Sequence, residues 1–342
     1  MELTTAEKQF LMLLRGVERQ PKDIETGEKV DANIETLKKR GKFYFSEKLD
    51  SMIFNEETIL KLLDNKLVEQ QETIFKLTNE GKGLAKKARK NLLNKNNNDI
   101  YKILNSSKTL ATITKQVYGK DLGQNNMMTM PELNILLEVL KITPEDSVID
   151  LGCGTGKITE YISNVTQAEV IGIDIASEAI KLAQERTQEK KEKLEFRVDD
   201  MDDLSIPPAS ADCIIAIDSL YFVEDLENTI EYMKSILKPQ GRMGLFYSAS
   251  CLPKESKDKL HPDKTKLAQA LQNHDLNYQT FDFSIEEQKF WNYIKDLYAK
   301  YKEEMEQEGN LVLQKDLYKD AEYHAKAYQE GRRSRHLYVV TT

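Results

Sequence analysis

Apolar and polar positions follow two alternating rhythms in the second half of the chain. Short, nearly continuous apolar runs are separated by segments with an apolar residue every three to four positions, the repeat of an amphipathic helix. The runs predict seven strands, at residues 148–151, 170–175, 194–198, 213–217, 242–247, 278–283 and 336–340. Strands that are apolar throughout are typical of a parallel sheet covered by helices on both faces. The pattern therefore predicts an α/β fold with a doubly wound sheet, which binds ligands at the carboxyl ends of its strands.

A tyrosine-rich insertion, residues 285–331, stands between the last two predicted strands. Its apolar pattern is helical and includes Phe290, Trp291 and Tyr298. Because the insertion joins two strands of the sheet, we expect it to fold over the carboxyl edge as a cover.

Residues 1–90 show a different pattern. Apolar residues at helical spacing from Phe10 to Leu14 and in residues 56–65 predict two helices. Residues 67–70 and 73–77 predict two short strands, and a basic helix follows up to Lys90. This order of helix, two strands and helix resembles the end of a winged-helix domain. The resemblance implies a mainly α domain that serves dimerisation or substrate binding.

The segment 91–98 is polar, lacks periodicity and predicts a linker. Together with a helical lead-in that reaches residue 130, it separates the first domain from a second one at residues 131–342. A length of 342 residues agrees with this division, because single cores rarely grow so large.

Composition narrows the setting and the partners. The net charge of −8 disfavours nucleic acid, since phosphate binding depends on Lys and Arg. The three cysteines, Cys153, Cys213 and Cys251, lack metal-ligand spacing and favour a reducing compartment. No apolar run approaches the about 20 residues that span a membrane, and the first residues lack a signal-peptide pattern. We therefore expect a cytoplasmic protein without a metal site.

The clearest chemical signal is the run Asp150-Leu-Gly152-Cys153-Gly154-Thr-Gly156 after the first predicted strand. Glycine adopts positive φ and lets a ligand lie against backbone N–H groups. A helix starting near Lys157 would point its positive end at that ligand. The spacing differs from the dinucleotide fingerprint and from the phosphate loop. It resembles the first motif of class I S-adenosylmethionine-dependent methyltransferases, D/E-x-G-x-G-x-G.

This resemblance implies a Rossmann-like sheet of seven strands, the last one antiparallel, with S-adenosylmethionine as the cofactor. It places the methionine end of the cofactor against the residues of the motif, namely Asp150, Gly152, Cys153, Gly154 and Gly156.

The second and third strands end in residues suited to the nucleoside. Asp174, followed by Ile175, can accept hydrogen bonds from both ribose hydroxyls. At the end of the third strand, Asp200 and Met201 match the place where the family brackets the adenine. Asp199 is an alternative one position away, and a solvated turn is the alternative to any role in binding.

The fourth strand ends at the position that faces the transferred methyl group in the family. Asp218 and Ser219 are expected at the cofactor there, and Asp218 and Tyr221 are the catalytic candidates. Asp218 could act as a general base or could only cap the next helix.

Candidate contacts to the methyl acceptor are scattered along the chain. Tyr118 lies in a segment that resembles the part of small-molecule methyltransferases lying over the cofactor, and Tyr247 ends the fifth strand. Arg332 and Arg335 could bind an anionic group of the acceptor, or could pair with acids of the insertion. His324 could accept a proton, although a lone histidine is more often structural.

These observations favour a methyltransferase that acts on nitrogen or oxygen of a small molecule, with a homodimer as one arrangement. Methyl transfer from a sulfonium is an in-line displacement, so the protein mainly supplies alignment and a water-poor cavity. Two alternatives use the N-terminal domain for docking: a methyltransferase of nucleic acid or protein, and a DNA-binding regulator that senses the cofactor.

Overall fold

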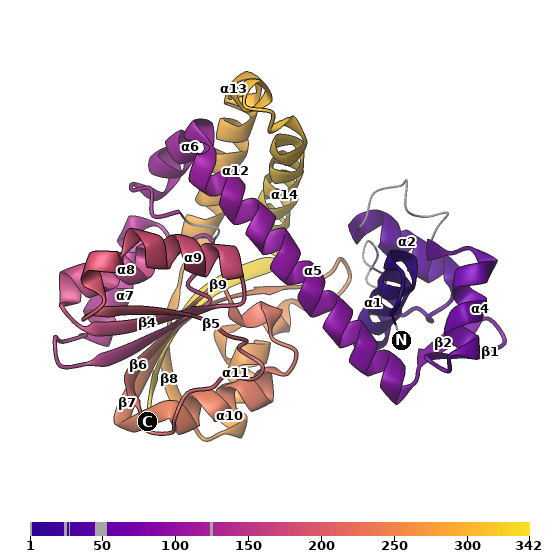
Figure 1. The fold of residues 1–342 in the computed structure, drawn as a ribbon, viewed down its shortest axis with the longest axis horizontal. Helices are drawn as coiled ribbons and strands as arrows, with labels where there is room; N and C mark the ends of the chain where they lie inside the picture. Colours follow the sequence, from indigo (N-terminus) through magenta and orange to yellow (C-terminus); the bar gives the residue numbers. More distant parts are fainter. Residues whose placement is uncertain (1, 24–25, 27, 45–52, 124–125) are drawn as a thin grey trace. The chain divides into compact units, whose positions relative to one another are not determined.

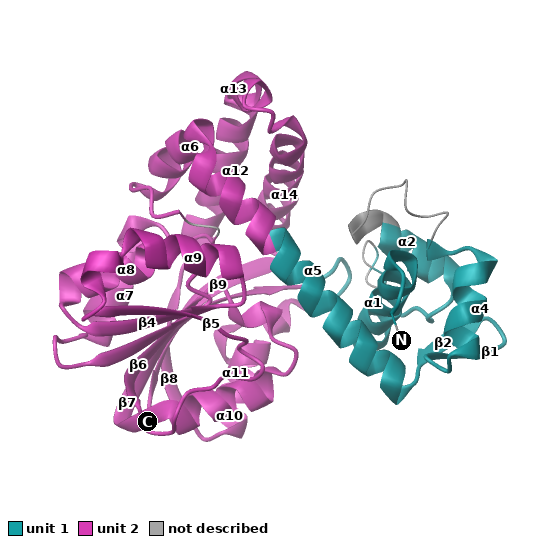
Figure 2. Cartoon of the chain, viewed as in Figure 1, with its two compact units in different colours: residues 1–96, 252–255 teal, residues 97–251, 256–342 magenta. Residues whose placement is uncertain are grey.

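The computed structural model describes residues 2–342 except 24–25, 27, 45–52 and 124–125. The chain divides into two compact units (Figure 2). One comprises residues 1–96 with 252–255, and the other residues 97–251 with 256–342.

The first unit is mainly helical. It contains α1 (Thr5–Arg19), α2 (Ile34–Tyr44), α4 (Glu56–Asp64) and an antiparallel pair of strands, β1 (Val68–Gln71) and β2 (Ile74–Leu77). Thr4 and Glu7 form a capping box that starts α1. The apolar face of α1 packs on Leu37, Leu62 and Phe75, so one core joins the helices to the strand pair.

The polar segment 91–98 is helical, which corrects the prediction of an irregular linker. It lies within α5 (Asn79–Ser106), a single helix that runs from the first unit into the second. Within the second unit, the Asn98 side chain accepts a hydrogen bond from the Glu178 backbone at 2.9 Å, and Tyr101 is buried. These tertiary contacts favour the helix where the local sequence shows no apolar period.

The second unit is built on the predicted seven-stranded sheet. Its strands are β3 (Ser147–Leu151), β4 (Glu169–Asp174), β5 (Leu194–Val198), β6 (Ala211–Ile217), β7 (Leu237–Ser250), β8 (Asn277–Asp282) and β9 (Arg333–Thr341). Their order is β5-β4-β3-β6-β7-β9-β8. The last strand in sequence, β9, pairs antiparallel with both β7 and β8, whereas β3 to β7 pair in parallel. The prediction of a Rossmann-like sheet with an antiparallel last strand is confirmed.

Helices cover both faces of this sheet (Figure 1). On one face α7 (Met130–Leu140), α8 (Lys157–Thr166) and α9 (Ser177–Arg186) bury Leu136, Ile162 and Ile180. On the other face α10 (Leu226–Ile236) and α11 (Lys266–Asn273) bury their apolar sides. Successive strand residues alternate between these two cores, as the pleat requires. Short 3₁₀ turns span Gln188–Lys190, Leu220–Phe222, Lys257–Leu260 and Pro262–Lys264.

The insertion forms three helices, α12 (Ser284–Lys300), α13 (Lys302–Gln307) and α14 (Leu311–Gln329). They enclose a separate core with α6 (Lys108–Tyr118), in which Ile113, Trp291 and Tyr328 are buried. The insertion leaves the sheet after β8 and returns at the start of the antiparallel β9, and both points lie at the carboxyl edge of the parallel strands. Among the described residues, none of the helices is long and apolar enough to cross a membrane.

Candidate active site

The glycine-rich turn follows β3 and has the backbone that its sequence predicts. Gly152, Gly154 and Gly156 have φ values of 79°, 55° and 69°, in the left-handed region that favours glycine. Side chains crowd each of them: a Cβ on Gly152 would collide with Ser219, one on Gly156 with Phe196, and one on Gly154 would lie 2.7 Å from the Tyr101 hydroxyl. The turn is therefore a tightly enclosed backbone cradle.

Two buried acids hold this cradle in place. The Asp150 carboxylate accepts a hydrogen bond from Thr159 Oγ1 at 2.6 Å, and burial raises its pKa to about 6. Asp174, at the end of β4, accepts from the backbone N–H of Gly154 and of Ala176, both at 2.8 Å. Burial also raises the pKa of Asp174. Asp174 thus connects the end of β4 to the glycine turn.

The residues after β4 and β5 lie at the same carboxyl edge of the sheet as the glycine turn. Ile175 and the Asp200–Met201 turn are partly exposed, and Met201 packs against the core under α10. The Asp199 carboxylate accepts from the backbone N–H of Asp200 at 2.8 Å and of Ser205 at 3.0 Å. The Asp200 carboxylate likewise accepts from the backbone N–H of Asp202 at 3.1 Å, so both acids help to close this turn.

At the end of β6, Asp218 has a φ of 53°, a left-handed conformation that is strained for a residue with a side chain. Its Oδ1 accepts from the Tyr221 hydroxyl at 2.5 Å, and its Oδ2 accepts from the Met127 N–H at 3.2 Å. The next turn begins after Ser219, so the alternative that Asp218 caps it is wrong. Ser219 Oγ instead donates to the Leu151 carbonyl at 2.7 Å, which links β6 to the start of the glycine turn.

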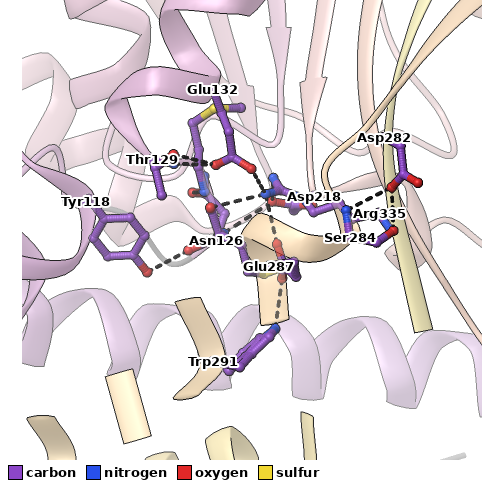
Figure 3. A network of polar contacts seen from close by, with 12 residues as sticks. Tyr118, Asn126, Thr129, Glu132, Asp218, Asp282, Ser284, Glu287, Trp291 and Arg335 are labelled. Carbon is purple, nitrogen blue, oxygen red and sulfur yellow. Dashed lines mark hydrogen bonds and ion pairs between the residues drawn. The ribbon is translucent and has the colours of Figure 1, made fainter. Parts of the chain in front are cut away.

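Asp218 also belongs to a buried ionic network around Arg335 (Figure 3). The guanidinium is fully buried and lies 2.7 Å from Asp218, 2.9 Å from Glu132 and 3.0 Å from Glu287. It also packs over the Phe246 ring at 4.6 Å. Glu287 accepts from Trp291 Nε1 at 2.8 Å, and burial raises its pKa to about 8. One guanidinium among three acids favours a proton on Glu287 at neutral pH.

The prediction that Arg335 contacts the acceptor is wrong, because its side chain has no exposed surface and is surrounded by three acids of the chain. Arg332 forms an ion pair with Glu330 at 2.5 Å and also lies outside the cavity described next. The alternative prediction was that these arginines pair with acids of the insertion. It holds for Arg332, and it holds in part for Arg335, because one of its three partners, Glu287, belongs to the insertion. The sequence indicated neither Glu132 nor Glu287, since both are acids on otherwise ordinary helical faces.

A cavity of about 330 Å³ lies between α6, α12, α14 and the end of β6. Its wall is mostly apolar and aromatic, and it includes three of the predicted site residues, Tyr118, Tyr221 and His324. Tyr118 donates to the Asn126 carbonyl at 2.7 Å. Tyr247 lies directly behind Tyr221, with ring centroids 5.3 Å apart, and burial raises its pKa to about 12. Tyr221 thus lies both at this cavity and at the Asp218 end of the cofactor edge.

His324 is held by three neighbours in the cavity wall. Its ring lies 4.4 Å from Trp291, its Nε2 is 3.3 Å from Asp320, and its Nδ1 is 2.6 Å from Arg333 Nη1. Because a guanidinium only donates, Nδ1 must be the acceptor, and the proton sits on Nε2 beside Asp320. Burial lowers the pKa of His324, which favours this neutral form. Asp320, Arg333 and Trp291 were not predicted as site residues.

Family models of known proteins match the chain over this region. The family model of the methyltransferase domain matches residues 142–319, and that of protein-L-isoaspartate O-methyltransferase matches residues 70–204. A Saccharomyces cerevisiae protein described as an S-adenosylmethionine-dependent methyltransferase is 31% identical over 36% of this chain and 43% of its own length. A ubiquinone biosynthesis O-methyltransferase from Xanthomonas campestris is 33% identical over 30% of this chain and 43% of its own length.

The matches thus span less than half the length of these relatives. The solved structure of the cyclopropane synthase MmaA2 from Mycobacterium tuberculosis shares the fold, with a TM-score of 0.58 at 11% identity over 70% of this chain and 95% of that one. The family model covers more than half of the chain, and it includes the glycine turn and the acids after β4 and β5. The chain therefore belongs to the S-adenosylmethionine-dependent methyltransferase domain family.

Proposed function

We propose that this protein transfers a methyl group from S-adenosylmethionine to nitrogen or oxygen of a small molecule held in the 330 Å³ cavity. One observation carries the proposal: Tyr221 lines this cavity and also bonds Asp218, at the edge where the glycine turn lies. The relatives include a ubiquinone biosynthesis O-methyltransferase and a Penicillium expansum O-methyltransferase, names that agree with a small acceptor.

The residues around the glycine turn fit the cofactor. Gly152, Gly154 and Gly156 admit no Cβ, so the backbone of the turn can lie against the methionine end, next to Asp150 and Cys153. The N–H groups of these three glycines are bonded within the chain and hold the turn in shape. Asp174 and Ile175 would hold the ribose, and Asp200 and Met201 the adenine. When bound, the cofactor supplies an activated methyl group.

The residues beyond the methyl group align the acceptor and exclude water. Asp218 accepts from the Tyr221 hydroxyl, so the Tyr221 ring has a fixed orientation at the cavity. The apolar wall around Phe290, Trp291 and Ile294 would limit the water around the acceptor, which favours an in-line displacement. His324 would take up the proton that the acceptor loses, provided that Arg333 releases Nδ1.

For the first unit we propose a winged-helix-like domain that serves dimerisation. The order of α4, the β1–β2 pair and α5 supports this assignment. Analytical ultracentrifugation of the full chain should give about twice the protomer mass of 39.4 kDa. A single species at the protomer mass would contradict the dimer.

Calorimetric titration tests the cofactor assignment. The wild-type chain should bind S-adenosylhomocysteine, and Asp174→Ala should weaken binding by about tenfold to a hundredfold, because charged hydrogen bonds to the ribose are lost. Asp316→Ala removes an exposed carboxylate from α14 and is the matched control, which should bind like the wild type. If the wild type binds no S-adenosylhomocysteine, the proposed function is wrong.

A further inference from the structure

Arg333, at the start of β9, is the arginine of the cavity wall. Its Nη1 donates to His324, and its guanidinium lies 5.6 Å from the Tyr328 ring centroid. Its Nε is buried without a hydrogen-bond partner, and so is the Tyr328 hydroxyl. Within the described part of the chain, no carboxylate forms an ion pair with Arg333.

The neighbouring arginines differ from Arg333 in having acidic partners, although the Nε of Arg335 is also buried without a hydrogen-bond partner. Arg332 pairs with Glu330, and Arg335 pairs with three acids. Among the described residues, Arg333 is the one member of this group without an anionic partner, and it is also the member that lines the cavity. The guanidinium is half-buried, and its buried Nε has no hydrogen-bond partner, so an anion bound to it would stabilise it. The arrangement therefore indicates that an anion from outside the chain binds there.

The rest of the wall restricts what that anion can be. One guanidinium offers one full positive charge, and Asp320 contributes a negative charge to the same wall. A dianionic phosphate would be repelled by Asp320, whereas a monoanionic carboxylate matches a single guanidinium well. The apolar side chains of Leu110, Ile113 and Ile294 suit a hydrocarbon or aromatic body attached to the carboxylate.

We propose that Arg333 binds a carboxylate of the methyl acceptor, and that the acceptor is a small monoanionic acid with an apolar or aromatic body. This inference rests on the proposed function, because it takes the cavity to be the acceptor site. It assigns to Arg333 the anion-binding role that the sequence suggested for Arg332 and Arg335.

Trp291 is the single tryptophan of the chain and lines the cavity, so its fluorescence reports what binds there. The probes are phenylacetate and phenylbutyrate, each compared with its neutral amide in the presence of S-adenosylhomocysteine. The wild type should bind at least one acid about tenfold or more tightly than its amide. Arg333→Met should abolish this preference and leave amide binding unchanged. Lys319→Met removes an exposed cation from α14 outside the cavity and should keep the preference.

The proposal is overturned if the amides bind as well as the acids, if Arg333→Met keeps the preference, or if no acid changes the Trp291 signal. Calorimetric binding of S-adenosylhomocysteine by the same preparations separates this result from the proposed function. If the cofactor product binds but acids show no preference, only the role of Arg333 is lost. Unchanged affinity of Arg333→Met for that product shows that the variant is folded.

Discussion

At the scale of single residues, the site combines glycines that admit no side chain with acids that burial affects strongly. Gly156 has a φ of 69° and would force a Cβ into Phe196. Asp150 and Glu287 have pKa values of about 6 and about 8 because both are buried. A single conservative substitution changes either a glycine or a buried acid, so the contribution of each residue to stability can be measured.

Gly156→Ala should destabilise the protein and weaken binding of S-adenosylhomocysteine. Gly309 is the matched control, since it has a φ of 78° but open space around a Cβ. Gly309→Ala should cost about 1 kcal/mol for the backbone alone, whereas Gly156→Ala should add about 1–3 kcal/mol for the collision. Urea unfolding measures both costs. Equal costs would contradict a tightly enclosed turn.

Glu287→Gln should change how stability depends on pH. Because burial raises the folded-state pKa of Glu287 from 4.5 to about 8, the folded state binds more protons than the unfolded state between these values. This group therefore makes the free energy of unfolding fall as pH rises through that window. The variant, whose side chain is neutral at every pH, should lack this fall and gain stability relative to the wild type between pH 5 and pH 8, by on the order of 1 kcal/mol or more.

Urea unfolding at several pH values checks this prediction. Glu286→Gln removes the exposed neighbouring acid of α12 and should leave the pH dependence of the wild type unchanged. The same slope in the wild type and in Glu287→Gln would show that Glu287 is not protonated in the folded state.

At the scale of elements, the Arg335 network holds four segments together. Arg335 belongs to β9, Glu132 to α7 and Glu287 to α12, while Asp218 follows β6 (Figure 3). The insertion is thereby attached to the carboxyl edge of the sheet at the residue that orients Tyr221. Attachment of the cavity wall and alignment of the acceptor thus depend on the same guanidinium.

Arg335→Met should lower the free energy of unfolding by about 3–5 kcal/mol, since it leaves buried acids without their cation. Arg332→Met removes a partly exposed arginine paired with one acid, and it should cost about 1 kcal/mol or less. Chemical denaturation compares the two variants. A cost for Arg335→Met as small as that for Arg332→Met would contradict a structural role of the network.

The parts of the site that were predictable from sequence are those made by neighbouring residues. The Asp150–Gly156 run and the acid at the end of β4 occur at spacings that the strand–turn–helix geometry dictates. For Arg335 the sequence predicted a contact with the acceptor instead of its acidic partners. These three acids are separated from it by 48 to 203 residues along the chain. Only the folded chain brings these acids to the arginine, so no local pattern could indicate them.

At the scale of the whole molecule, features made by residues close in sequence were again predictable, whereas features made by distant contacts were not. The alternating pattern predicted seven strands, and the family resemblance added the antiparallel direction of β9. The segment 91–98 was expected to be irregular, because its asparagines and lysines have no apolar period. It is helical since it continues α5, whose end is anchored through Asn98 and Tyr101.

The account joins a cofactor cradle to an acceptor cavity through Tyr221. A crystal structure of the protein with S-adenosylhomocysteine tests this claim most directly. The account predicts the ligand against Gly152 to Gly156, with its ribose on Asp174 and its sulfur facing Tyr221 and the 330 Å³ cavity. A ligand bound elsewhere, or one whose sulfur faces away from that cavity, would contradict it.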